Sequence, residues 1–176
     1  TWRRGRCLPY GDGVTFWALG EMVKAQTGIL ESDSAEAVEA KLHRGVHDLV
    51  ADTKEATWVE GHLRPLVALD APQGERRDEA FTAWRRFFEG LADWGPLVLV
   101  FEDIHWADRG LLDLIEHLAA RMHGPPIMLL TLARPDLLDS RPGWGGGLSG
   151  YISMPLQPLV GNEAEALAFN VLRGIE

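Results

Sequence analysis

Two adjacent carboxylates, Glu102 and Asp103, directly follow five apolar residues, Leu97 to Phe101. An unbroken apolar run of this length predicts a strand that is buried on both faces of a parallel sheet. Ligands gather at the carboxyl ends of such strands. Neighbouring carboxylates are costly there unless a cation is bound, because both lose hydration next to each other. Mg²⁺ meets that need, since it takes one or two carboxylates and keeps water and phosphate oxygens as its other ligands.

Two other interpretations of this segment stay open. Glu102 and Asp103 can simply cap and solubilise the end of a strand, because a motif outside its context is only a hypothesis. With His105 and Asp108 they can also form a zinc or iron site of a metal-dependent hydrolase, since imidazole and carboxylate together suit those metals. Against the second interpretation, His105 has no other histidine at helical spacing, which catalytic zinc sites usually have. Asp108 is a good N-cap for the helix that follows it.

The elements that must position these residues alternate between helices and apolar strands. Besides Leu97–Phe101, we expect a short strand ending at Cys7, a buried strand at Ile127–Leu132 and a third candidate at Tyr151–Leu156. Apolar residues at helical spacing predict helices over about 14–26, 33–49, 58–63, 75–93, 108–122 and from 162 onwards. This alternation favours an α/β domain with a parallel sheet, in which 97–101 and 127–132 are neighbours.

Composition and charge narrow the classes of function. With 176 residues, 46% of them apolar and 24% charged, the chain has the make-up of one globular domain. Its apolar runs are far shorter than the roughly 20 residues that cross a bilayer, so we expect no membrane segment. A net charge of −9 repels a phosphate backbone, so direct nucleic-acid contact is not expected. The single cysteine, Cys7, fits a reducing compartment, and we expect a cytoplasmic protein.

The string Phe101-Glu102-Asp103-Ile104-His105-Trp106-Ala107-Asp108 resembles the Walker B segment of a family of P-loop ATPases. These are the signal-transduction ATPases with numerous domains, which are attached to bacterial adenylate cyclases and to large regulators of the LuxR type. Three further stretches agree in order and spacing. Residues 5–11 resemble the family's second strand and the turn after it, residues 130–135 its sensor strand, and residues 156–159 the start of its helical lid.

The resemblance assigns roles to three residues. It implies that Glu102 helps to hold Mg²⁺, through water, and that Asp103 orients or deprotonates the attacking water. Arg134, after the sensor strand, is implied to sense or neutralise the γ-phosphate of ATP. These roles suit phosphoryl transfer, which depends on positioning and on compensating the charge of the phosphate oxygens. Glu102 stands where many relatives have Asp, so either acid can be the one nearer the metal. Alternatively, Arg134 is a surface arginine that pairs with Asp136.

One expected motif is absent from the 176 residues. None of Lys24, Lys41 and Lys54 follows a glycine loop or precedes Ser or Thr, so no Gly-x-x-x-x-Gly-Lys-Ser/Thr sequence is present. In the family this phosphate-binding loop and the first strand precede residues 5–11, and the chain also lacks an initiator Met, so we expect a truncated core. The expected fold is a three-layer P-loop NTPase-type parallel sheet with helices on both faces, missing its first strand. Residues 1–160 form that core, and 161–176 begin a helical lid.

The resemblance implies a multidomain signalling ATPase, in which bound ATP or ADP, with Mg²⁺, controls a cyclase or a DNA-binding effector of the same parent chain. The parent would hydrolyse ATP, whereas the isolated fragment would be inactive. An alternative is a non-catalytic protein-interaction module that retains a degenerate NTPase fold. In the family the missing first strand lies between those at 127–132 and 151–156, so we expect a gap of about 10 Å, two strand spacings, between these strands.

Overall fold

A computed structural model describes residues 1–9, 15–67 and 77–173. The predicted helix starts at 14 and 75, and the last residues of the predicted lid, lie outside these ranges. The elements are β1 (Trp2–Arg6), α1 (Trp17–Thr27), α2 (Ala35–His47), α3 (Thr53–Val67), α4 (Arg77–Ala92), β2 (Leu97–Glu102), the 3₁₀ turn η1 (Ile104–Trp106), α5 (Arg109–Arg121), β3 (Ile127–Thr131), α6 (Leu137–Ser140) and α7 (Asn162–Arg173).

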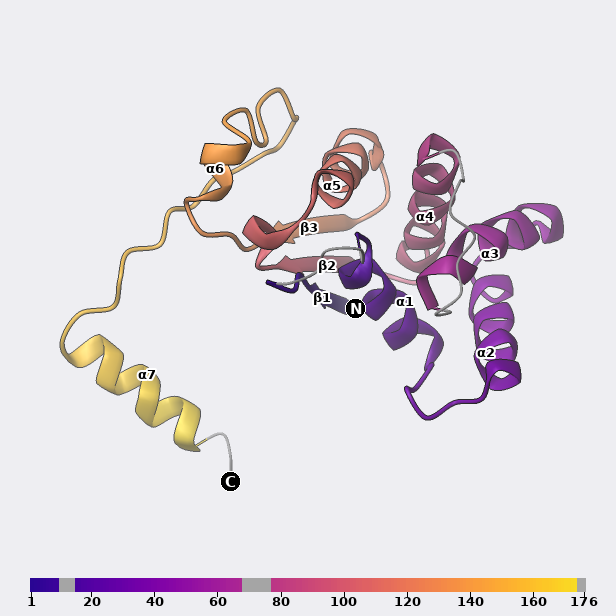
Figure 1. Ribbon diagram of the computed structural model, residues 1–176, viewed down its shortest axis with the longest axis horizontal. Coiled ribbons are helices and arrows are strands. Elements are labelled where there is room, and N and C mark those ends of the chain that lie inside the picture. The colour runs from indigo at the N-terminus through magenta and orange to yellow at the C-terminus, as the bar shows by residue number, and fades with distance from the viewer. Residues whose placement is uncertain (10–14, 68–76, 174–176) are drawn as a thin grey trace.

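The three strands form one parallel sheet in the order β1-β2-β3 (Figure 1). Leu99 at the centre of β2 lies between Arg3 of β1 and Leu129 of β3. The prediction that 97–101 and 127–132 are adjacent parallel strands is therefore confirmed, as is the short strand that ends next to Cys7. Strand β2 is central and paired on both edges, and its apolar run without alternation is typical of such a strand.

The sheet has one face that is packed and one that is largely open. Leu97, Leu99 and Phe101 are at most 1% exposed, whereas Trp2 and Met128, which share the opposite face, are 66% and 56% exposed. Both crossovers, from β1 to β2 and from β2 to β3, step across the sheet in the same direction. Because such crossovers are right-handed, their helices lie on the same face. The expectation of helices on both faces is therefore not met within the described residues.

Gly5 allows helix α1 to approach β1 closely. A Cβ atom built on Gly5 would lie 1.9 Å from the backbone oxygen of Ala18 in α1, closer than any two such atoms can come. The same pair of elements is joined at its other end, where the Arg3 Nε donates to Gln26 Oε1 over 2.9 Å. The absence of a side chain at Gly5 thus sets the position of α1 against the sheet.

Aromatic rings fill the space between the helices on the packed face. Phe87 and Phe88 of α4 are fully buried and meet edge to face, with ring centroids 5.5 Å apart. Phe16, just before α1, packs edge-on against Trp84 of α4 at 4.7 Å. These contacts join α1 and α4 into the core that supports the sheet.

The predicted strand at Tyr151–Leu156 is wrong, since these residues have no regular secondary structure. Pro155 has no N–H group for a strand ladder, and β3 pairs only with β2 within the described residues. Instead, residues 144–154 run past β3 and α5 and form with them an open cleft of about 530 Å³, lined by Met128 and Ile152 among others. The expected gap between two flanking strands is thus not tested, because one of the two strands does not form.

Helix α7 lies apart from the rest of the chain and buries none of its residues (Figure 1). It was predicted from Asn162, and it begins there. Within the described residues, no helix combines the length and apolar character required to cross a membrane.

We predict that Gly5→Ala lowers the free energy of unfolding by about 2 to 3 kcal/mol, because its methyl group must push α1 away from β1. Urea denaturation followed by tryptophan fluorescence measures the change. Gly61→Ala is the matched control, since a Cβ on Gly61 meets nothing within 4 Å and alanine favours the helix interior by about 0.5 to 1 kcal/mol. Equal stabilities of the two variants would contradict the close packing at Gly5.

Candidate functional site at the carboxyl edge of the sheet

Asp103 forms a sharp turn directly after β2. Its backbone has φ 56° and ψ 37°, in the left-handed region, and it is the only residue other than glycine with a positive φ among those described. Asp tolerates this conformation better than most residues, but it still costs roughly 1 kcal/mol or more. Strain of this kind concentrates at functional sites and is an observation in favour of one here. The turn ends β2 and starts η1.

Arginines of the neighbouring strand neutralise both predicted acids. The Nε of Arg6 donates to Asp103 Oδ2 over 2.7 Å, and Arg4 Nη1 lies 3.7 Å from Glu102 Oε1. The hydrogen bond to Asp103, followed by the charges of Asp103, Glu102 and Glu21, raises the pKa of the Arg6 guanidinium above its ordinary value. Both arginines are exposed, so water screens these pairs and a bound cation can replace them at small cost.

Arg134 follows β3 and lies at the same edge of the sheet as the acids. Its backbone N–H donates to Nδ1 of His105 over 3.4 Å, and the N–H of Ile104 donates to the Leu132 carbonyl over 3.0 Å. The segments after β2 and β3 are therefore joined side by side. The side chain of Arg134 is exposed, and within the described residues no ion pair joins it to Asp136. The expectation that Glu102, Asp103 and Arg134 emerge at one edge of the sheet is met.

His105 and Asp108 have structural partners. Asp108 caps α5 as predicted, since its Oδ1 accepts from the N–H of Leu111 over 3.0 Å. The ring of His105 stacks at a tilt on Trp106, with centroids 4.8 Å apart, while its Nε2 is buried without a hydrogen-bond partner. The four residues of the hypothetical zinc or iron site do not form a group with metal-ligand spacing in the part of the chain described. Their geometry therefore does not support the metal-dependent hydrolase.

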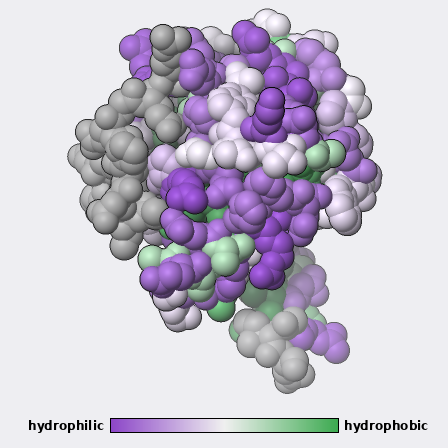
Figure 2. Space-filling model, turned by 90° about the vertical axis from the view of Figure 1, so that its right-hand side faces the viewer, coloured by the Kyte–Doolittle hydropathy of each residue, from purple (hydrophilic) through white to green (hydrophobic). Residues whose placement is uncertain are grey.

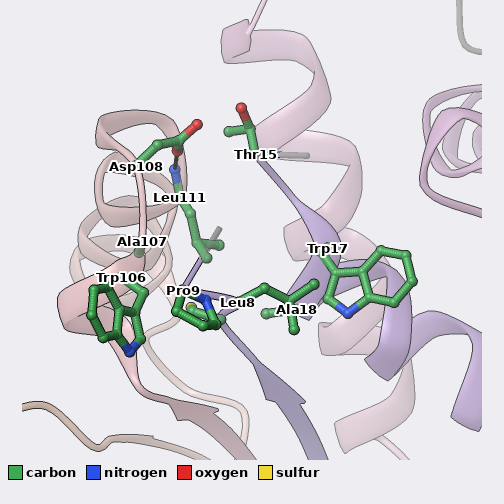
Figure 3. A pocket seen from close by; sticks show the side chains of 10 residues that line it. Leu8, Pro9, Thr15, Trp17, Ala18, Trp106, Ala107, Asp108 and Leu111 are labelled. Carbon is green, nitrogen blue, oxygen red and sulfur yellow. Dashed lines mark hydrogen bonds between the residues drawn. The ribbon is translucent and has the colours of Figure 1, made fainter. Parts of the chain in front are cut away.

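A small cavity lies between the ends of β1 and β2 and the helices that follow them (Figure 3). Trp106 and Asp108 line it on one side and Trp17 on the other, with Leu8 between them, and Cys7 also contributes to the lining. Its volume of about 100 Å³ is below the roughly 300 Å³ at which ligand pockets begin, so it cannot enclose a nucleotide. Asp103 and Arg134 lie outside this cavity, at the open edge of the sheet.

Sequence reasoning missed the partners of the two acids. Arg4 and Arg6 alternate along β1 and therefore point to the same face, which was a usable signal once β1 was recognised as a strand. Their pairing with Glu102 and Asp103 also needed the register of β1 on β2, which places Arg6 opposite Glu102. That register follows from the tertiary structure.

Comparison with known proteins also relates this domain to ATPases. A family model described as an AAA ATPase domain matches residues 2–130. An uncharacterized protein of Rhizobium meliloti (strain 1021) is 29% identical over 136 residues, which cover 74% of this chain. The matched region is 13% of the length of that relative, so the chain spans only a small part of it. No solved structure gives a significant match.

We predict that Cys7 reacts very slowly with thiol reagents in the native chain. Burial, and then the charges of Asp103, Asp108 and Glu21, raise the pKa of its thiol from 9.0 to about 12. At pH 8 the thiolate fraction falls about 1000-fold, and the thiolate is the reactive species. The rate of modification by Ellman's reagent, with and without 8 M urea, measures the effect. Native and denatured rates within about tenfold of each other would contradict the burial of Cys7.

Proposed function

Because the chain belongs to the AAA ATPase domain family, we propose that it is part of the nucleotide-binding core of an ATP-dependent switch. The observation that carries the proposal is the convergence of Glu102, Asp103 and Arg134 at the carboxyl edge of a parallel sheet. Two carboxylates and one guanidinium group at this edge can bind a metal ion and the phosphate groups that the ion contacts.

The acids have the donor chemistry that Mg²⁺ requires. Glu102 and Asp103 offer carboxylate oxygens whose protein partners are exposed arginines, so these oxygens can exchange partners. In the proposal Glu102 holds the ion, and Asp103 orients the attacking water and accepts its proton. Bound Mg²⁺ would neutralise charge on the phosphate oxygens. Arg134 contacts the γ-phosphate and so distinguishes ATP from ADP.

The proposal depends on a phosphate-binding loop from outside residues 1–176, because these residues contain no Gly-x-x-x-x-Gly-Lys-Ser/Thr sequence. Within the described residues the outer edge of β3 has no partner strand, which supports the proposal, since a further parallel strand can add there and bring such a loop to the carboxyl edge. The isolated chain should accordingly bind ATP with Mg²⁺ much more weakly than a protein that also contains the loop.

The switch would act on other domains of the same protein. The relative from Rhizobium meliloti is several times longer than the matched region, which is compatible with a multidomain architecture. In the proposal the effector is a cyclase or a DNA-binding domain, and α7 begins the helical lid that follows residues 1–160. The exposed apolar residues of α7, among them Leu167 and Phe169, are available for packing within such a lid.

A second candidate is a non-catalytic interaction module with a degenerate NTPase fold. One observation favours it: Asp103 and Glu102 already have arginine partners from β1 and need no metal for charge balance. This candidate predicts that a protein containing the complete domain binds no ATP.

In the complete ATPase, we predict that Asp103→Asn lowers the turnover number for ATP by about 100- to 10,000-fold, the usual contribution of a general base. ATP affinity should change little, because the remaining groups hold the nucleotide. Asparagine also tolerates the left-handed backbone at this position, so the turn is preserved. Steady-state phosphate release and calorimetric ATP binding measure the two quantities.

Asp139→Asn is the control, since Asp139 is an exposed acid in α6 without a proposed role. It should leave both quantities unchanged. If Asp103→Asn hydrolysed ATP at an unaltered rate, the general base would be Glu102 or another group. Absence of ATP binding by the unmodified protein would instead favour the interaction module.

A further inference from the structure

Two histidines and a carboxylate meet between α2 and α3, away from the carboxyl edge of the sheet (Figure 1). His43 and His47 lie one turn apart on α2, and Glu60 is on α3. The His43 Nδ1 atom is 2.8 Å from Glu60 Oε2, and the His47 Nε2 atom is 3.4 Å from the same oxygen. Their i, i+4 spacing on one helix is a sequence signal for a shared site.

The three ligand atoms have nearly the separation that a tetrahedral ion needs. All lie within 4.8 Å of one another. Zinc bound at about 2.0 to 2.2 Å from each ligand requires ligand atoms roughly 3.3 Å apart, so small side-chain rotations suffice. Two neutral imidazoles and one carboxylate are a common set for zinc, and they leave the fourth position for water.

The protein environment prepares these atoms for a cation. The side chain of Glu60 is only 9% exposed, and a buried carboxylate needs positive partners. His47 Nε2 is itself buried and has no hydrogen-bond partner, because its 3.4 Å approach to Glu60 lacks the required geometry. A ring nitrogen that is buried, has no hydrogen-bond partner and lies 3.4 Å from a carboxylate oxygen is a second observation that points to a missing ligand.

Arg64 engages the other oxygen of the same carboxylate. Its Nη2 donates to Glu60 Oε1 over 3.1 Å, and its Nη1 donates to Glu39 over 2.8 Å. Glu60 Oε2 is thereby left to the histidines as a single ligand atom. Arg64 also orients the carboxylate from outside, as a neighbour of a metal ligand commonly does.

The site can be reached from solvent. The side chain of His43 is 61% exposed, so an ion and its water can enter past this residue. The side of the molecule beyond α2 and α3 is predominantly hydrophilic (Figure 2). This surface suits a hydrated ion better than an apolar partner.

We propose that His43, His47 and Glu60 bind one Zn²⁺ ion, with water as the fourth ligand, and that the ion joins α2 to α3. The site is independent of the proposed ATPase chemistry, because none of its residues lies at the carboxyl edge of the sheet. Glu60, His43 and Arg64 without a metal would form only a hydrogen-bonded cluster that holds the same helices.

Calorimetric titration of the full-length protein with Zn²⁺, after purification without a polyhistidine tag, tests the proposal. His43→Ala should lower the affinity of the protein for the single Zn²⁺ ion by about 100-fold. Loss of groups that only support metal ligands already lowers metal affinity by about 10- to 100-fold. His47→Ala and Glu60→Gln should do the same. His123→Ala, at an exposed histidine beyond α5, is the control and should bind as the unmodified protein does.

Co²⁺ provides a second readout, because its visible absorption reports tetrahedral coordination by histidine and carboxylate. The absorption should appear with the unmodified protein and His123→Ala and be lost with His43→Ala. His43 is exposed, so this variant is expected to fold even if Glu60→Gln does not, and circular dichroism verifies it. No saturable binding up to about 1 mM Zn²⁺, or equal binding by His43→Ala, would overturn the proposal.

Discussion

The register of three parallel strands determines where every candidate residue of the sheet lies. Arg6 is opposite Glu102, and Phe101 is opposite Thr131, so β1, β2 and β3 end at nearly the same level. Residues that are about 30 or 100 positions apart in the chain thereby reach one edge. The hydrogen bonds from Leu132 to Phe101 and from Ile104 to Leu132 continue this alignment beyond the strands. A shift of the register would separate Asp103 from both Arg6 and Arg134.

Among the described residues, helices pack against one face of the sheet and maintain that register. The approach of α1 to β1 at Gly5, and the aromatic contacts of Phe16 and Trp84, cover the face formed by Leu99 and Phe101. The other face shows Trp2 and Met128 to solvent, and in the ranges that the structure describes no further strand pairs with the outer edge of β3. Backbone groups and apolar side chains of this kind are normally covered in a parallel sheet. The described part of the chain therefore brings Asp103, Arg6 and Arg134 to one edge, while it leaves one face of the sheet without covering helices.

The carboxylates at the edge of the sheet and the carboxylate between α2 and α3 are neutralised in different ways. At the carboxyl edge, exposed arginines balance Glu102 and Asp103, and solvent screens each pair. Between α2 and α3, Glu60 is buried. Burial alone raises the pKa of its carboxyl group, but hydrogen bonds from His43 and Arg64 outweigh that effect and lower the pKa overall. The first arrangement permits exchange of partners, whereas the second holds two helices together.

Local patterns in the sequence were sufficient for several parts of this structure. The apolar runs identified β2 and β3, helical spacing identified α4 and α5, and Asp108 was recognised as the cap of α5. Such features depend on neighbours in the chain, and so does the Walker B resemblance of residues 101–108. Tertiary structure decided the rest. Tyr151–Leu156 has strand-like residues but no partner strand, and the helices occupy one face because both crossovers turn the same way. The pairing of Arg6 with Asp103, and of His43 and His47 with Glu60, joins separate elements, whose relative placement no local pattern contains.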